Sequence, residues 1–210
     1  MLVDSELLSA SVLTQLMMER GLPIDAEIFR SEFLGRSFAT ASKRYEHRLG
    51  VSFPDDFNME YRSRLLTQMK GNLHAMPGVE SVLRAMKVSF CLATSSSPQR
   101  LAVSMAESGL EKFFEGRSFT ASEVEHGKPA PDLMLHAARQ MGVASDFCLV
   151  IEDSEMGLRA AAAAAMEAWR FTGGGHLKEP DVLPSDITPA RVLDSMPAML
   201  NALREIGIAE

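Results

Sequence analysis

The stretch FCLVIEDSEMG, residues 147–157, decides the fold. It opens with five apolar residues that continue directly into Glu152 and Asp153. A short unbroken apolar run is typical of a strand buried on both faces of a parallel sheet. Two neighbouring carboxylates at the end of such a strand are costly to hold together unless a cation or water reaches them. Because oxygen ligands suit Mg²⁺, the pair predicts a magnesium site; the alternative is that Asp153 or Ser154 caps a helix beside a solvated Glu152.

The overall composition narrows the class of protein. Of 210 residues, 46% are hydrophobic and 23% are charged, and the net charge is −7. This balance argues against nucleic acid or an anionic membrane as the main partner, but not against a small phosphorylated metabolite. No run of about 18 apolar residues predicts a membrane span. Asp4 and Glu6 do not fit a signal peptide, so we expect a cytoplasmic protein. The sequence leaves its oligomeric state open.

Two kinds of pattern divide the chain. From residue 5 to about 75 the apolar spacing is helical, with the first helix ending near Gly21. From about residue 76 short apolar runs alternate with helical segments, which indicates parallel strands covered by helices on both faces. We therefore predict a doubly wound α/β core over 76–210, preceded by a helical domain. The predicted strands are 88–94, 117–121, 147–151 and 168–171, and the predicted helices between them are 98–109, 131–141 and 154–165.

Two further predicted strands also end in polar residues. After the first comes TSSSP, with Thr94 to Ser97 followed by Pro98 in the first turn of a helix. Hydroxyls and free N–H groups at a helix N-terminus can bind an anion, although a helix cap alone needs only one hydroxyl. After the second comes GKPAPD, in which prolines hold the backbone around Lys128. An ordinary surface lysine beside a turn is the alternative for that residue.

Taken together, the three strand ends predict one site. Ligands of such folds bind beyond the carboxyl ends of the strands. Hydroxyl donors, one ammonium and a cation held by two acids would surround a tetrahedral anion, as phosphoryl transfer requires.

These motifs make the chain resemble the haloacid dehalogenase (HAD) superfamily, in the branch of β-phosphoglucomutase and small sugar-phosphate phosphatases. The matching stretches are LVDSE, ATSSSP, GKPAPD and VIEDSEMG with the alanine-rich helix behind it. The resemblance implies a Rossmann-like core with a helical cap domain over 5–75, and makes residues 1–4 a remnant of the first core segment. It also implies a magnesium-dependent phosphatase that acts on a small phosphorylated metabolite through an aspartyl-phosphate.

The resemblance further implies roles for individual residues. Thr94 and the Ser95 backbone would bind the phosphate, which Lys128 would neutralise, and Ser96 would touch the substrate. Asp153 would bind Mg²⁺, with Glu152 assisting directly or through water. The segment FLGRSF, residues 33–38, would set specificity through Arg36.

The family's nucleophile is absent from this sequence. An Asp-x-Asp-Gly motif on the first, central strand should stand immediately before Met1, and Asp4 matches a later position. Three readings remain open. The true start lies upstream; the chain is a non-catalytic phosphate-binding relic; or the protein is a phosphoglucomutase-type phosphotransferase. Ala165 also departs from the family, which usually has Gly there, at a cost of roughly 1 kcal/mol if its φ is positive.

Overall fold

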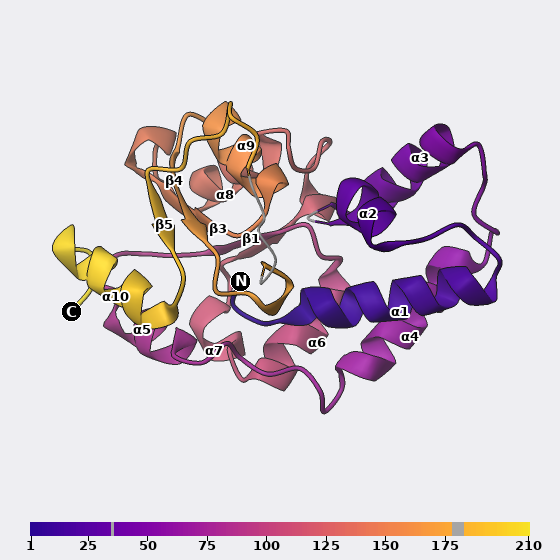
Figure 1. Cartoon of the computed structure of the whole chain (residues 1–210). Coiled ribbons are helices and arrows are strands. Elements are labelled where there is room, and N and C mark those ends of the chain that lie inside the picture. Colours follow the sequence, from indigo (N-terminus) through magenta and orange to yellow (C-terminus); the bar gives the residue numbers. More distant parts are fainter. Residues whose placement is uncertain (35, 178–182) are drawn as a thin grey trace.

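The computed structural model describes residues 1–34, 36–177 and 183–210, so Gly35 of the FLGRSF segment lies outside it. Figure 1 shows an arm of helices beside a layered α/β unit. The arm, which we call the cap helices, contains α1 (Ser5–Glu19), α2 (Ala26–Ile28), α3 (Phe38–Leu49) and α4 (Phe57–Met69). A wider, π-helical turn at Phe29–Phe33 follows α2. None of the helices in the described ranges is long and apolar enough to cross a membrane.

The cap helices enclose a hydrophobic interior of their own. Helices α1 and α4 pack against each other, and aromatic rings from α3 and the neighbouring loops fill the space beside them. Phe38 stacks on Phe57 with ring centroids 6.0 Å apart, and Phe53 lies 4.6 Å from Phe57. Such aromatic pairs add to the stabilisation that comes from area burial alone.

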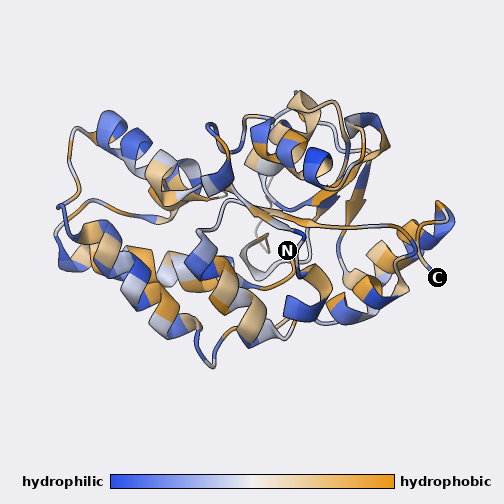
Figure 2. Cartoon of the chain, turned by 180° about the vertical axis from the view of Figure 1, so that it is seen from behind, coloured by the Kyte–Doolittle hydropathy of each residue, from blue (hydrophilic) through white to orange (hydrophobic). Residues whose placement is uncertain are grey.

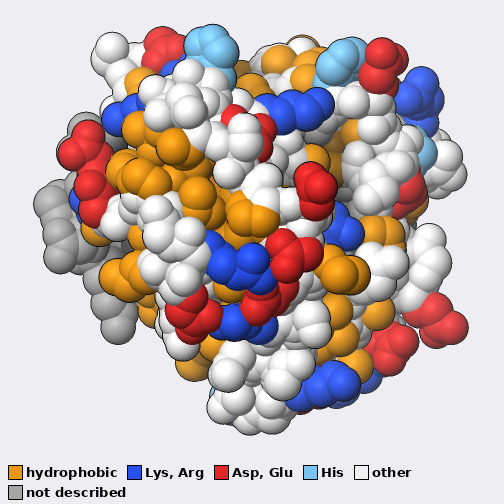
Figure 3. All heavy atoms as spheres, turned by 90° about the vertical axis from the view of Figure 1, so that its right-hand side faces the viewer, with side chains coloured by type: hydrophobic (Ala, Val, Ile, Leu, Met, Phe, Trp, Pro, Cys, Tyr) orange, Lys and Arg blue, Asp and Glu red, His pale blue; other side chains and the backbone are white. Residues whose placement is uncertain are grey.

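The outer surface of the cap helices carries a charge network. Arg20 pairs with Asp56 and Glu60, and Arg64 pairs with Glu60 and Glu19. Figure 3 shows acidic and basic side chains next to one another on this end of the molecule. Because these groups are solvent-exposed, each pair contributes little to stability.

The α/β unit confirms the predicted class, since strands β1 to β5 pair in parallel, with only isolated antiparallel bridges such as Met86 to Ala209 beside them in the described residues. Strand β1 (Leu92–Thr94) pairs with β2 (Ser118–Thr120), while β3 (Leu149–Glu152), β4 (Glu167–Phe171) and β5 (Arg191–Leu193) form a second sheet. Strand β1 covers only the last three residues of the predicted 88–94, which pair in register with the three residues of β2. Strand β5 has no counterpart in the sequence prediction.

Helices cover both faces of these sheets. One face packs against α5 (Val79–Ala85), α6 (Pro98–Ser108), α7 (Glu111–Phe114) and α10 (Met196–Glu205). The other packs against α8 (Asp132–Gln140) and α9 (Glu155–Ala163). Figure 2 shows hydrophobic strands running between these helical layers. The predicted helices 98–109, 131–141 and 154–165 are confirmed to within two residues at each end.

Candidate active site

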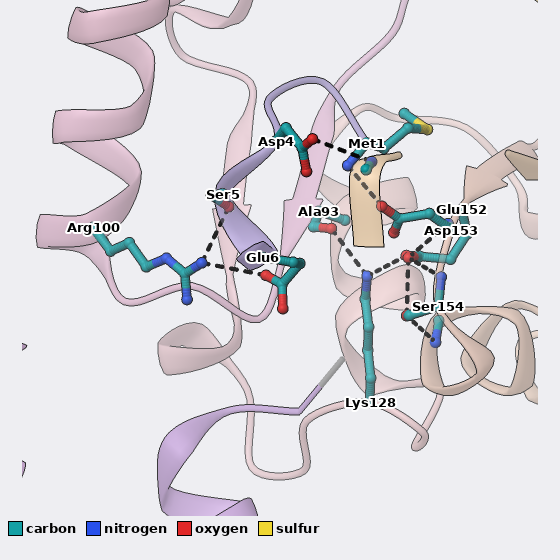
Figure 4. Close-up of polar contacts among 12 residues, drawn as sticks. Met1, Asp4, Ser5, Glu6, Ala93, Arg100, Lys128, Glu152, Asp153 and Ser154 are labelled. Carbon is teal, nitrogen blue, oxygen red and sulfur yellow. Dashed lines mark hydrogen bonds and ion pairs between the residues drawn. The ribbon is translucent and has the colours of Figure 1, made fainter. Parts of the chain in front are cut away.

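Lys128 joins two of the strand ends. Its Nζ donates to the Ala93 carbonyl at 3.3 Å and to Glu152 Oε2 at 2.6 Å. The Lys128 side chain is only 6% exposed, so both contacts lie in a poorly hydrated place where charge attraction is strong. Figure 4 shows this ammonium between the end of β1 and the acid pair. The structure therefore brings Thr94, Lys128, Glu152 and Asp153 to one edge of the α/β unit.

The Glu152 carboxylate is fully occupied by neighbouring donors. Its Oε1 accepts from the backbone N–H groups of Asp153 and Ser154 and from the Ser154 hydroxyl, at 3.0–3.1 Å. Its other oxygen takes the Lys128 ammonium. A side chain at Gly157 would overlap this carboxylate, which explains the glycine in the motif. In this arrangement Glu152 fixes Lys128 and the turn into α9.

Asp153 points to a different cation. Its Oδ2 lies 2.7 Å from the Met1 α-ammonium, and the Asp153 side chain is 13% exposed. Burial by itself lowers the pKa of that ammonium, but the attraction of Asp153 and Glu152 outweighs burial and raises the pKa. Asp153 thus faces a positive charge in the 210-residue chain.

The metal-ligating groups are few. No group of three or more His, Cys, Asp or Glu side chains gathers to hold an ion in the part of the chain that the structure describes. A magnesium site of one or two carboxylates completed by water and phosphate oxygens agrees with this set. Asp153 and the neighbouring Glu152 supply carboxylate oxygens at this edge, so the donor chemistry fits Mg²⁺.

The hydroxyl groups of residues 94–97 differ in their hydrogen bonds. Ser97 caps α6 by accepting the Arg100 N–H at 3.3 Å, and the Thr94 hydroxyl accepts the Ser96 N–H at 3.1 Å. Among the described residues, nothing hydrogen-bonds to the Ser95 or Ser96 hydroxyl. The capping alternative thus holds for Ser97 alone, and Ser95 and Ser96 are left to face the cavity that they line.

Arg36 lines the same cavity from the side of the cap helices. Its guanidinium donates to the Ser31 carbonyl at 3.0 Å. Burial lowers the pKa of Arg36, and the nearby Arg44 lowers it further, so an anion in the cavity would stabilise the charged guanidinium. The structure does not bring Arg36 into contact with Thr94 or Lys128.

Sequence reasoning missed a second polar cluster at the root of α1. Arg100 of α6 donates to the Ser5 hydroxyl at 3.1 Å and to Glu6 at 3.2 Å, and Asp4 accepts the Gly175 N–H at 3.1 Å (Figure 4). These contacts attach the start of the cap helices to the α/β unit. A signal was available, because Arg100 lies three residues after Ser97 and so on the same side of α6.

Comparison with known proteins matches this chain to one hydrolase family and to phosphatases. The sequence profile of the haloacid dehalogenase-like hydrolase family matches residues 2–165. The 6-phosphogluconate phosphatase of Escherichia coli is 26% identical over 202 residues, which cover 96% of this chain and 90% of that protein. A probable pseudouridine-5'-phosphatase of Drosophila melanogaster is 45% identical over 105 residues, 46% of this chain and 45% of that protein.

A solved structure supports the same relationship. The HAD family hydrolase of Deinococcus radiodurans, which has bound phosphate and sodium, superimposes with a TM-score of 0.75 at 32% identity. The match covers 99% of this chain and 93% of the other.

Proposed function

The chain belongs to the haloacid dehalogenase-like hydrolase family, and from this premise we propose that it is a magnesium-dependent phosphatase of small phosphorylated metabolites, in particular sugar phosphates. The observation that carries the proposal is the position of Lys128. Its ammonium bonds to Ala93, next to Thr94, and to Glu152, next to Asp153. A phosphate at this edge would meet donors on one side and a cation-binding carboxylate on the other. Two of the relatives are named as phosphatases of phosphorylated small molecules, 6-phosphogluconate and pseudouridine-5'-phosphate.

Each residue has a separate task in this proposal. The Thr94 hydroxyl and the Ser95 N–H donate to the phosphate oxygens, and Lys128 neutralises the charge that these oxygens carry. Glu152 holds the lysine in place, while Asp153 would hold Mg²⁺. When bound, the ion would supply charge stabilisation for the transferring phosphoryl group. Arg36 would cover the site from the cap helices.

The attacking group is not among these residues. No Asp-x-Asp-Gly stretch occurs in the 210 residues, so we place the reactive carboxylate on a segment outside them. That carboxylate would attack phosphorus, the ester oxygen would leave and take up a proton, and water would then hydrolyse the aspartyl-phosphate. The proposal requires in-frame codons upstream of Met1 that encode an apolar strand followed by this motif.

The test compares the 210-residue chain with a chain extended by the upstream codons. Release of inorganic phosphate from a panel of sugar phosphates is measured with Mg²⁺ and with a chelator. We expect the extended chain to release phosphate only with Mg²⁺, and Asp153→Asn to lower the rate by about 10²-fold or more. Asp146→Asn, an exposed position just before β3, is the matched control and should keep full activity.

Two outcomes would contradict the proposal. One is an extended chain that releases phosphate from none of the substrates. The other is turnover that survives both Asp153→Asn and chelation.

A further inference from the structure

One polar wall of the cavity has no task in the proposed function. The cavity has a volume of about 1270 Å³ and is lined by residues of both the cap helices and the α/β unit. Its polar wall contains Glu6 and Ser9 of α1, Tyr61 of α4 and Arg100 of α6. We call these four side chains the Tyr61 cluster.

Two hydroxyl groups of the Tyr61 cluster are buried and share one hydrogen bond. The Ser9 and Tyr61 oxygens lie 2.6 Å apart, and the two residues are 5% and 6% exposed. Each hydroxyl carries one hydrogen, so whichever group donates in this bond, the hydrogen of the other is left over. No acceptor for that hydrogen occurs among the residues that the structure describes. A buried donor without an acceptor costs about 1–3 kcal/mol, so a ligand oxygen in the cavity would be stabilised beside it.

Arg100 and Glu6 add two charges that compensate each other. The guanidinium donates to Glu6 Oε1 at 3.2 Å, while the Arg100 Nε is buried and has no hydrogen-bond partner within the described ranges. In the described part of the chain, no hydrogen bond reaches the second Glu6 oxygen either. The pair therefore still offers one donor and one acceptor. A neutral hydroxyl group, which donates and accepts, suits this pair better than a second anion does.

The electrostatic environment of Tyr61 shows that these groups lie close together. Burial raises the pKa of the Tyr61 hydroxyl, Arg100 and the bond to Ser9 lower it, and Glu6 raises it. Because the net effect is an increase, the hydroxyl stays protonated at neutral pH. It therefore keeps its ability to donate a hydrogen bond.

The Tyr61 cluster lies near the expected position of the phosphate. Arg100 stands in the first turn of α6, three residues after Ser97, or roughly 4.5 Å along the helix axis. Ser95 and Ser96, in the loop before α6, line the same cavity. A sugar phosphate carries its hydroxyl groups within a few bonds of the ester oxygen, which matches this short separation.

We propose that the Tyr61 cluster binds neighbouring hydroxyl groups in the part of the substrate that leaves with the ester oxygen. The spare hydrogen of the Ser9–Tyr61 pair donates to one oxygen of the ligand, Arg100 donates to another, and Glu6 accepts a hydroxyl hydrogen. The substrate is then a polyhydroxylated phosphate ester, and esters of plain alkyl chains are poor substrates. This inference rests on the proposed function, because it names the substrate class of that site.

The test compares phosphate esters that differ in their hydroxyl groups. The chain extended by the upstream codons is assayed with Mg²⁺ on sorbitol 6-phosphate against hexyl phosphate, and on glucose 6-phosphate against cyclohexylmethyl phosphate. The first pair examines an open chain and the second a ring. We expect the hydroxylated ester of at least one pair to have a kcat/KM about 10²-fold or more above its counterpart, because the counterpart leaves buried polar groups unpaired.

Two variants assign this preference to the Tyr61 cluster. Tyr61→Phe removes the hydroxyl and keeps the ring, whose centroid lies 5.3 Å from that of Phe38 in the cap helices. We expect KM for the hydroxylated ester to rise about tenfold with little change in kcat, and the alkyl ester to be unaffected. Ser9→Ala removes the other hydroxyl and should give the same pattern.

Tyr45→Phe is the matched control. Tyr45 is also buried in the cap helices, but its hydroxyl donates to the Pro23 carbonyl at 2.7 Å and the residue does not line the cavity. The same chemical change is made and a hydrogen bond is lost, so an effect that acts only through the stability of the cap helices would appear in both tyrosine variants. We expect Tyr45→Phe to leave KM for both esters unchanged. Thermal unfolding of each variant checks that it is folded.

Three results would overturn the inference. They are equal kcat/KM within both pairs of esters, a hydroxyl preference that survives both Tyr61→Phe and Ser9→Ala, and equal losses in Tyr61→Phe and Tyr45→Phe.

Calorimetric binding to the same extended chain separates this inference from the proposed function. Suppose that no ester releases phosphate, but a hydroxylated ester binds more tightly than its counterpart and Tyr61→Phe removes the difference. The Tyr61 cluster then binds hydroxyl groups and the proposed function fails. If phosphate is released without any preference for hydroxyl groups, the inference on the Tyr61 cluster fails alone, and if no ester is hydrolysed or bound, both fail.

Discussion

The cap helices and the α/β unit differ in how each closes its hydrophobic interior. The cap helices follow one another along the chain and cover their apolar faces with their own neighbours, leaving Leu16, Met17 and Phe57 fully buried. The α/β unit brings together strands that are distant in the sequence, and among the described residues no strand pairing joins its two sheets. Local helical packing therefore completes one interior, while the other depends on contacts between segments that are far apart in the chain.

The largest expected effect is on the free energy of unfolding, when the same change of leucine to alanine is made in each of the two interiors. Leu16→Ala in α1 removes a fully buried side chain from closed packing, so we expect it to lower the free energy of unfolding by about 3–5 kcal/mol. Leu92→Ala in β1 removes a side chain that is only partly buried and lines the cavity, and should cost less than about 2 kcal/mol.

The chain offers a separate probe for each region. Both tyrosines, Tyr45 and Tyr61, lie in the cap helices, and Trp169 lies in β4. Urea unfolding followed by tyrosine circular dichroism and by tryptophan fluorescence therefore reports on the two interiors in one sample. Equal losses for Leu16→Ala and Leu92→Ala would contradict this contrast between the two interiors.

A smaller effect tests the polar contacts inside the cap helices. Glu32 is 3% exposed and pairs with Arg48 at 2.7 Å and Arg44 at 3.3 Å. Burial alone would raise the pKa of Glu32, but these two arginines outweigh it and lower the pKa below its ordinary range. We expect Glu32→Gln to cost about 1.5–3 kcal/mol at neutral pH, since charge-assisted hydrogen bonds are lost.

The sign of the pH dependence follows from the lowered pKa. A carboxylate with a depressed folded pKa stabilises the fold above its unfolded pKa of about 4.3, and this contribution disappears as the pH falls through the folded value. The stability gap between wild type and Glu32→Gln should therefore be constant near pH 7 and shrink in acid. Glu27→Gln, at an exposed position in α2, is the control that should show no gap. A gap that widens in acid would reverse the assignment.

The sequence could predict the part of the candidate site that depends only on where the strands end. Thr94 ends β1, Lys128 lies in the segment after β2, and Asp153 directly follows β3. Because the carboxyl ends of parallel strands lie at one edge of the sheet, their gathering could be predicted without knowledge of side-chain rotamers. The direction of the Glu152 carboxylate could not be predicted, because it depends on a turn and on the absence of a side chain at Gly157. Roles for these residues remain predictions.

The sequence also did not predict the contacts between segments that are far apart in the chain. Arg100 and Glu6 meet because α6 packs beside the start of α1, and that depends on the relative position of the two units. Strand β5 is only three residues long and carries no pattern that identifies it. Sequence periodicity indicates local elements, and it is silent on contacts that only the assembled fold creates.

The smallest effect concerns how helices end in the two regions. In the cap helices, α3 ends on Gly50 at a φ of 65°, whereas α9 in the α/β unit ends through Ala165 at a φ of 55°. The Ala165 N–H donates to the Ala162 carbonyl and the Met166 N–H to the Ala161 carbonyl, a Schellman arrangement whose left-handed residue is usually glycine. The positive φ considered from sequence for Ala165 is thus confirmed, and the methyl group there is strained.

Ala165→Gly should relieve this strain, although it also makes the unfolded chain more flexible. We expect the free energy of unfolding to rise by about 0.5–1 kcal/mol. Ala162→Gly, at an exposed helical position three residues earlier, makes the same chemical change and should lose up to about 1 kcal/mol. Trp169 fluorescence in urea measures both, because α9 packs against β4. Opposite signs for the two variants would locate the strain at the helix end, and equal signs would refute it. A gain at Ala165 would also show that α9 in the α/β unit, unlike α3 in the cap helices, ends at a strained backbone position.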